Sequence, residues 1–397
     1  MCAEGYIGEG CFQCSKDYSI ADGNPLTCTP CPSWSTSFVA RGIAFYAAKD
    51  LILFVSATVN AIAASPVKRK QSAVLLNQLM AFATVSDILC SGIMYTKAFH
   101  NITTSTRRLL QRMQIPVDFA QVQGDETLSK QCLLRHFGLP DSLGYTHLAS
   151  MIFPASLMAI LAIKDPFLSL VVGTNVFLPG FTAAFGRYLI AFHIQPQSAG
   201  GQLKMPFLPG FGVTFDILAI SAAVLLCFAF GILGWWHMTH ANGKDQDEVP
   251  PQHVLYLIQS YTPESRSWEI ERLVRKMILS FITCAIPVSY SPALQTEAVS
   301  LTLLTSLILY TMLLPYKVKV WNFSEIGLLT LGLVLAGLTT TLVANDSHWS
   351  RTNTTIILII LVISLVSLIC GMMAILVMLN MFWEWQSHRR ASTQGQQ

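Results

Sequence analysis

The segment 356–381 is an almost wholly apolar run without a single Asp, Glu, Lys or Arg. A bilayer core about 30 Å thick is crossed by roughly 20 such residues in an α-helix. Helices suit this role because every backbone polar group is satisfied within the segment, away from water. The run therefore predicts a membrane-spanning helix near the C-terminus.

Composition extends this prediction to the whole chain. Only 12% of the residues are charged and 52% are hydrophobic, whereas a soluble domain has about 25% charged residues. The net charge of +3 is too small to favour nucleic acid as a partner. The chain is expected to be a multi-pass membrane protein whose principal partner is the lipid bilayer.

Charge-free apolar windows predict an all-α polytopic membrane protein with about nine transmembrane helices. Two long apolar stretches are divided at prolines, one at Lys164-Asp165-Pro166 and one at 287–292. We expect a small N-terminal module over 1–37, a helical transmembrane domain over 38–385 and a cytoplasmic tail over 386–397. The expected helices cover 42–64, 73–97, 145–163, 167–194, 211–236, 271–289, 293–314, 323–344 and 354–382.

The distribution of Lys and Arg predicts the orientation. Alternate connecting segments are rich in basic residues, which are typical of cytoplasmic loops. This places the N-terminus outside and the C-terminus in the cytoplasm, in the plasma membrane. The basic segment 98–144 falls on the outer side against the rule. The sequons at Asn101, Asn345 and Asn353 fall in outer loops and are expected to be glycosylated.

Five of the ten cysteines lie in the first 31 residues. Dense cysteines beside Gly and Pro are typical of a disulfide scaffold in an oxidising compartment, and we expect Cys2 to remain unpaired. A four-cysteine zinc site is the alternative that the Cys-x-x-Cys spacing leaves open. No signal peptide precedes the module, so either the first span is a signal anchor or a longer ectodomain is truncated here; we favour truncation. The expected disulfide cysteines are Cys11, Cys14, Cys28 and Cys31.

Three segments carry a resemblance to known proteins. The N-terminal sequence CAEGYIGEGCFQCSKDYSIADGNPLTCTPCP resembles the end of an EGF-like or ephrin-receptor-like array. The sequences SWEIERLVRKMILSF (267–281) and LLPYKVKVWNFSEIGLL (313–329) are similar to signatures of large multi-pass surface proteins of protists and algae. That family has a transmembrane region compared with transient-receptor-potential and polycystin channels. The resemblance implies a channel-like protein, which is an analogy of fold rather than of site.

Ionisable side chains inside predicted spans are candidates for function, because burying them in lipid costs several kcal/mol. Lys49 and Asp50 lie two turns into the first predicted span, and Asp87 lies near the middle of the second. These three residues could form a structural ion pair or line an ion path. Asp87 is the strongest candidate because it lies deepest.

Two further groups lie near predicted span ends. The first comprises Arg187, Asp216 and Glu297, which either anchor the helices at the interface or attract ions to an outer vestibule. Glu325 opens the eighth predicted span, where a carboxylate suits a helix N-terminus.

The second group is a basic turn at the start of the sixth predicted span. It holds Arg272, Arg275 and Lys276 at helical spacing after Trp268. Such a turn is typical of a topological anchor, and it also suits anionic lipid headgroups. Both interpretations remain open.

The resulting hypothesis is a channel-like protein that conducts inorganic cations along a path between helices. The connection 345–353 is too short for a re-entrant pore loop, so Asp87 is expected to line the path. The alternatives are a surface receptor or adhesion protein that binds an extracellular ligand, and a transporter or scramblase; a homo-oligomer is compatible with each. We expect no enzyme, no cofactor and no metal, because the chain lacks Gly-x-Ser-x-Gly, phosphate-loop and His-Glu-x-x-His motifs.

Overall fold

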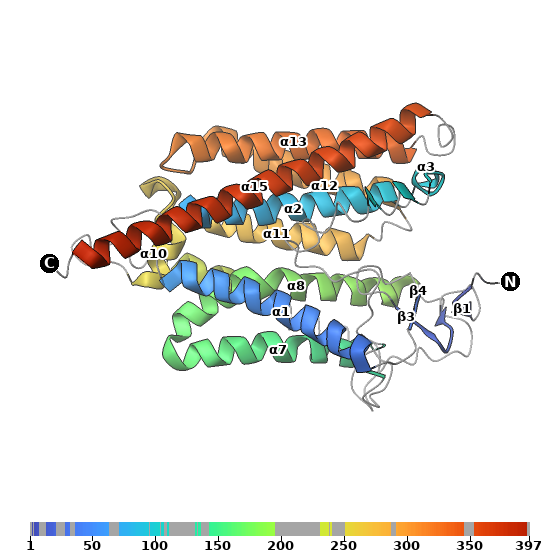
Figure 1. Ribbon diagram of the computed structural model, residues 1–397, viewed down its shortest axis with the longest axis horizontal. Helices are drawn as coiled ribbons and strands as arrows, with labels where there is room; N and C mark the ends of the chain where they lie inside the picture. The colour runs from blue at the N-terminus through green and yellow to red at the C-terminus, as the bar shows by residue number, and fades with distance from the viewer. Residues whose placement is uncertain are drawn as a thin grey trace. The chain divides into compact units, whose positions relative to one another are not determined.

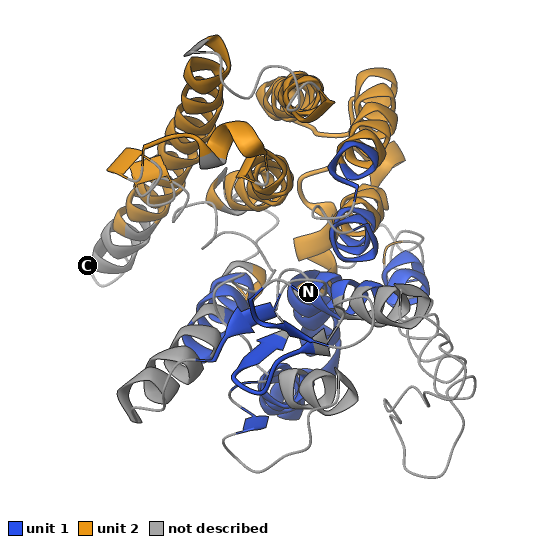
Figure 2. Ribbon diagram, turned by 90° about the vertical axis from the view of Figure 1, so that its right-hand side faces the viewer, with its two compact units in different colours: residues 1–59, 122–237, 277–295 blue, residues 60–121, 238–276, 296–397 orange. Residues whose placement is uncertain are grey.

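The computed structural model is mostly helical (Figure 1). It describes residues 36–62, 71–94, 143–194, 251–286, 291–344 and 353–394 continuously, with parts of 2–31, 96–110, 132–135 and 231–239. The chain divides into two compact units (Figure 2). Unit 1 comprises residues 1–59, 122–237 and 277–295, and unit 2 comprises residues 60–121, 238–276 and 296–397.

The N-terminal module of unit 1 contains two antiparallel β-hairpins. Strand β1 (Tyr6–Ile7) pairs with β2 (Gln13–Cys14), and β3 (Tyr18–Ile20) pairs with β4 (Cys28–Pro30). Two such short ladders have almost no core of their own and depend on covalent links.

Disulfide bonds supply those links. Cys14 is bonded to Cys28, and Cys31 is bonded to Cys132, 101 residues further along the chain. The expected zinc alternative is therefore wrong for these cysteines. The prediction that Cys2 stays unpaired is also wrong, since Cys2 is disulfide-bonded. Cys132 is not among the predicted disulfide cysteines, because sequence spacing carries no information about a partner so distant. Cys11 lies outside the described residues.

The helices of unit 1 pack around a hairpin of α7 and α8. Asp165 separates the two helices, and its Oδ1 accepts a hydrogen bond from the backbone N–H of Leu168 at 2.9 Å, which caps α8. This confirms the predicted division at Lys164-Asp165-Pro166. Trp235 donates its indole N–H to Thr174 Oγ1 at 3.0 Å in the buried interior. The helices of this unit are α1 (Thr36–Ile62, up to residue 59), α7 (Leu143–Lys164), α8 (Pro166–Ile194) and the second half of α11 (Trp268–Ala285).

Unit 2 is a bundle in which α2 contacts both α13 and α15. Its longest helix, α15, is 42 residues, or about 63 Å, twice the thickness of a bilayer core. Near the far end of α15, Glu384 accepts hydrogen bonds from Ser72 N at 3.2 Å and Ser72 Oγ at 2.6 Å, which neutralises the start of α2. The helical elements are α2 (Gln71–Met94), α3 (Lys97–His100), α10 (Gln252–Ile258), η2 (Pro263–Ser265), the first half of α11, α12 (Pro292–Leu313), α13 (Lys319–Ala344) and α15 (Asn353–Gln394).

Five helices, not nine, are long and apolar enough to cross a membrane among the described residues. Helix α11 is not one of these candidate spans, because it carries Glu269, Glu271 and three basic residues. The described apolar parts of α1 and α7 cover only Asp50–Val59 and Met151–Lys164, and most of 211–236 lies outside the described residues. Membrane orientation stays a prediction. The five candidate spans are Val74–Met94, Pro166–Ala183, Pro292–Leu313, Lys319–Ala344 and Thr354–Glu384.

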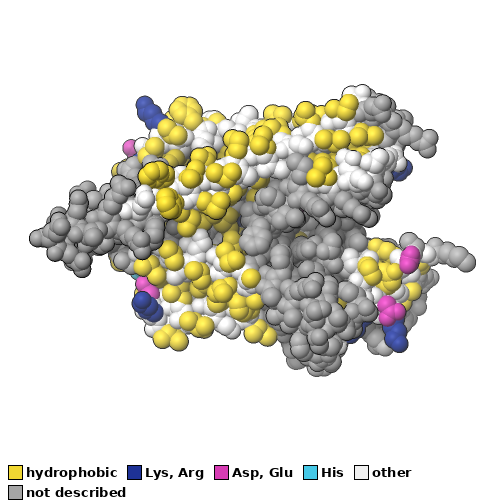
Figure 3. Space-filling model, in the orientation of Figure 1, with side chains coloured by type: hydrophobic (Ala, Val, Ile, Leu, Met, Phe, Trp, Pro, Cys, Tyr) yellow, Lys and Arg dark blue, Asp and Glu magenta, His cyan; other side chains and the backbone are white. Residues whose placement is uncertain are grey.

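The outer surface of the spans is apolar. Large hydrophobic side chains such as Leu301, Val320, Phe323 and Leu368 are more than half exposed. Figure 3 shows how widely hydrophobic side chains cover the described part of one face. Exposed apolar area on this scale is incompatible with water and is satisfied by lipid. The structure therefore supports a multi-pass membrane protein that contacts the bilayer.

Two helical glycines differ in the space that surrounds them. A Cβ at Gly186 would lie 3.2 Å from the backbone N of Ala285 and 3.2 Å from the backbone O of Phe281, atoms that cannot easily move. A Cβ at Gly337 would meet nothing within 4 Å among the described residues. Gly186→Ala is expected to lower the free energy of unfolding by about 1–2 kcal/mol through overpacking. Gly337→Ala is expected to raise it by about 0.5–1 kcal/mol through helix propensity.

Thermal unfolding of the purified variants in detergent would measure both effects. Opposite shifts are the expected result. Equal shifts for Gly186→Ala and Gly337→Ala would contradict the close approach of α8 and α11.

Candidate functional site

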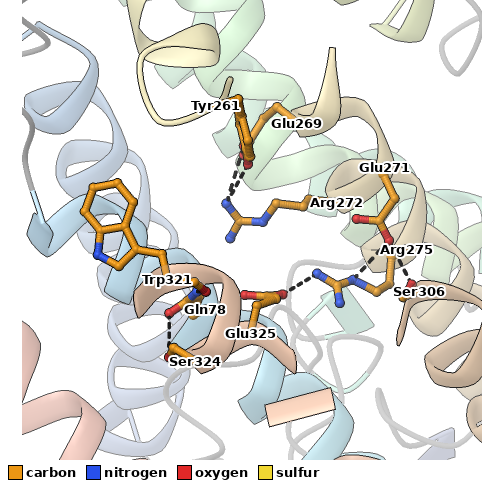
Figure 4. A network of polar contacts seen from close by, with 10 residues as sticks. All are labelled: Gln78, Tyr261, Glu269, Glu271, Arg272, Arg275, Ser306, Trp321, Ser324 and Glu325. Carbon is orange, nitrogen blue, oxygen red and sulfur yellow. Dashed lines mark hydrogen bonds and ion pairs between the residues drawn. The ribbon is translucent and has the colours of Figure 1, made fainter. Parts of the chain in front are cut away.

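The densest group of buried charges lies in unit 2, where α11 begins (Figure 4). Helix α11 places Glu269 and Arg272, and also Glu271 and Arg275, on shared faces at i,i+3 and i,i+4 spacing. Its acidic residues lie in the first turn, where they suit the helix dipole. The side chains of Glu269, Arg272, Arg275 and Lys276 are all buried.

The first cluster in this group joins Glu269, Arg272 and Tyr261. The Tyr261 hydroxyl donates a short hydrogen bond to Glu269 Oε2. Arg272 Nη1 lies 3.4 Å from the same carboxylate oxygen and 3.3 Å from the Tyr261 hydroxyl. One carboxylate therefore orders both a phenol and a guanidinium.

The second cluster is centred on Arg275, which lies between two carboxylates. Arg275 Nη2 donates to Glu325 Oε1 at 2.6 Å, and Nε lies 3.6 Å from Glu271 Oε1. Glu271 Oε1 also accepts a hydrogen bond from Ser306 Oγ at 2.8 Å. The guanidinium lies 5.4 Å from the ring centre of Tyr310, a distance typical of a cation–π contact. Arg275 thus connects α11 with α12 and α13.

The turn between α12 and α13 completes the wall of this site. Thr262 N donates to Pro315 O at 2.9 Å, and Lys317 N donates to Ser260 O at 3.1 Å. The rings of Tyr261 and Tyr316 stack with centres 5.1 Å apart. These contacts hold the segment before α11 against the α12–α13 turn.

The same turn contains a strained residue and a side-chain brace. Leu314 has φ of 40°, a left-handed conformation that is uncommon for a residue other than glycine. Asn322 stabilises it by accepting from Tyr316 N at 3.0 Å and donating to Tyr316 O at 2.9 Å. The side-chain amide of Asn322 therefore satisfies both backbone polar groups of Tyr316 in this turn.

Burial changes the proton affinity of groups in the site. It raises the pKa of Tyr261, and the neighbouring Glu269 carboxylate raises it further. It lowers the pKa of Lys276 to about 8, with repulsion from Arg272 as the next cause. The Tyr261 hydroxyl is therefore a stable donor at neutral pH, whereas Lys276 loses its charge in mildly alkaline solution.

More polar side chains lie along the interior of the same unit. Gln78 Nε2 donates to Trp321 O at 3.2 Å, and Ser324 Oγ donates to Gln78 Oε1 at 3.2 Å. Thr340 Oγ1 donates to Thr296 Oγ1 at 2.9 Å. These pairs join α2 to α13 and α12 to α13 within candidate membrane spans, where hydrogen bonding of interior polar groups is typical.

The three residues expected to share an ion path belong to two different units of the chain. Asp87 is 8% exposed in α2 of unit 2. Asp50 is half-buried in α1 of unit 1, and the side chain of Lys49 lies outside the described residues. The proposed pairing of these three residues stays a prediction.

The other predicted groups have different outcomes. Glu297 is exposed on α12, while Asp216 and the side chain of Arg187 lie outside the described residues, so the outer vestibule stays a prediction. Asn101 is exposed just after α3, as a glycosylation site requires. Asn345 and the side chain of Asn353 lie outside the described residues.

The basic turn is not presented on the surface. Arg272, Arg275 and Lys276 are at most 6% exposed, and the two arginines face carboxylates of their own unit. Contact with lipid headgroups stays a prediction. Glu325 does not merely open α13, since it binds Arg275 across 50 residues of sequence.

Sequence reasoning did not assign a role to Glu269, Glu271 or Tyr261. The i,i+3 and i,i+4 spacing of Glu269–Arg272 and Glu271–Arg275 is a signal that could have predicted the two local ion pairs. No local pattern connects Tyr261 or Glu325 to this site, because both contacts depend on how separate elements pack.

Comparison with known proteins gives no relative. No protein-family model, no curated protein and no solved structure matches the chain.

Proposed function

We propose that this protein conducts cations across a membrane along the polar interior of unit 2. The observation that carries the proposal is the carboxylate of Asp87, which is buried near the middle of the candidate span Val74–Met94. A charged group at that depth costs at least a few kcal/mol and is typical of ion pathways.

Other polar side chains support a path along the same bundle. Buried groups lie on three neighbouring helices at several positions along their length, whereas the outward faces are apolar. Hydrogen-bonding groups at successive levels could replace water around a partly dehydrated cation. The supporting residues are Gln78 and Asp87 on α2, Thr296 and Ser306 on α12, and Asn322, Glu325 and Thr339 on α13.

Replacing Asp87 by asparagine tests this function. A unit charge about 8 Å from a cation contributes about 2 kcal/mol at an effective dielectric constant of 20. Asp87→Asn is therefore expected to reduce cation conductance or selectivity by at least about tenfold. Whole-cell and planar-bilayer recordings of the full-length protein would measure the change.

Glu264→Gln is the control, because it removes an exposed carboxylate of unit 2 that lies outside the candidate spans. Its currents should equal those of the parent protein. Unchanged currents in Asp87→Asn would remove Asp87 from the path. Absence of current under voltage, stretch and calcium, in protein shown to reach the surface, would reject conduction and favour the receptor hypothesis.

A further inference from the structure

One edge of the Arg272 guanidinium is hydrogen-bonded and the other is unpaired. Nη1 contacts Glu269 and Tyr261, whereas Nε and Nη2 are buried and have no hydrogen-bond partner among the described residues. The whole side chain is only 3% exposed. Nε–H and Nη2–H form the side-by-side fork that matches two oxygens of a carboxylate or phosphate. Leaving such donors unpaired in the interior is costly.

The surrounding charges form one connected network. Arg275 is engaged by both Glu271 and Glu325. On the other side, Glu269 is shared between Tyr261 and Arg272, and Arg272 is also the strongest charged influence on Lys276. Glu325 also acts on both Arg272 and Lys276, so three cations face three carboxylates, and the case for an anion comes from the unpaired Nε and Nη2 donors of Arg272.

Further donors lie in the same aromatic wall. The hydroxyls of Tyr310 and Tyr316 are buried without a hydrogen-bond partner in the described part of the chain. Their rings lie 6.1 Å apart, and Tyr316 stacks on Tyr261, the residue that contacts Arg272. A hydroxyl donor next to a guanidinium fork is typical of oxyanion sites.

We propose that the unpaired Nε–H and Nη2–H of Arg272, together with Lys276 and the Tyr316 hydroxyl, bind one oxyanion of the phosphate, sulfate or carboxylate type. The oxyanion is supplied either by an anionic lipid headgroup or by a soluble anion. Arg275 takes no part, because two carboxylates already neutralise it. Since Arg272 is 2% exposed, the anion reaches it only when the packing around its side chain opens. This binding does not depend on the proposed conduction.

Inorganic sulfate tests whether a soluble anion binds, because its charge is constant across neutral and alkaline pH. The full-length protein in phosphatidylcholine nanodiscs is titrated with sulfate, and with chloride at equal ionic strength. Sulfate is expected to raise the unfolding temperature. Arg272→Lys keeps the charge but removes the fork, and should weaken apparent affinity at least about tenfold. Lys276→Met should also weaken it, whereas Lys319→Met, at an exposed lysine, should not.

A pH series gives a readout that does not require a folded Arg272 variant. The charged groups that act on Lys276 include Glu269, Arg272 and Arg275 on α11 and Glu325 on α13. With the pKa of Lys276 lowered to about 8, sulfate affinity should fall between pH 7 and 9 in the parent protein. In Lys276→Met the affinity should be flat over that range. A pH profile that is identical in both proteins would overturn the proposal.

Nanodiscs containing phosphatidylserine distinguish the source of the oxyanion. If this lipid stabilises the parent protein but not Arg272→Lys, and sulfate then has no further effect, the site binds a lipid headgroup. Stabilisation by sulfate alone would assign it to a soluble anion. No shift in either arm beyond the chloride control, or equal shifts in the parent and Arg272→Lys, would reject the site.

Discussion

Arg275→Met is expected to lower the free energy of unfolding by about 3–5 kcal/mol. The substitution removes the cation that lies 2.6 Å from Glu325, whose side chain is 3% exposed. Glu325 would then be a buried carboxylate without its partner, and the charge of Glu271 would lose its i,i+4 neighbour. Denaturation of the purified protein in detergent, followed by tryptophan fluorescence, measures the loss.

The double variant Arg275→Met/Glu325→Leu separates a lost ion pair from lost packing. Replacing both partners by apolar residues of similar size is expected to recover most of the stability, because the carboxylate left without a cation is then Glu271, which is 16% exposed and keeps its hydrogen bond from Ser306. Glu297→Gln, at an exposed position, should change stability by no more than about 0.5 kcal/mol. A single variant within about 1 kcal/mol of the parent would mean that Glu325 is hydrated, contrary to the structure.

Loss of the Cys31–Cys132 disulfide is the second large effect. This bond closes a loop of 101 residues, and a loop of that length restricts the unfolded chain by about 4–5 kcal/mol. The double substitution Cys31→Ser/Cys132→Ser, which leaves no unpaired thiol at either position, is expected to lower stability by about that amount. Surface delivery and unfolding in detergent would measure the change.

The Cys14–Cys28 disulfide is the matched comparison, with a separation of only 14 residues. Its removal as a double serine variant is expected to cost about 3 kcal/mol, less than removal of the longer link. The reverse order would contradict the long-range bond. Trypsin digestion and mass spectrometry without reduction should recover Cys31 and Cys132 in one linked fragment.

Much of the fold could be predicted from residue pattern. The charge-free runs in α12, α13 and α15 predict spans directly, because helix hydrogen bonds and apolar side chains are local properties. The division at Lys164-Asp165-Pro166 was predictable for the same reason, since proline and a capping carboxylate act on their own turn. Counting apolar windows overestimated the number of spans at α11, where Glu269 and Arg272 share a short amphipathic helix with other charges.

The candidate site was only partly accessible to such reasoning. The sequence by itself determined that charged residues cluster at 269–276 and that the long helices are apolar, because both depend on spacing along one helix. Only the tertiary structure decided that Arg275 binds Glu325, that Tyr261 lies against Arg272, and that Cys31 bonds Cys132. These contacts join elements distant in the chain, and their energies depend on burial and approach distance, which no local pattern contains.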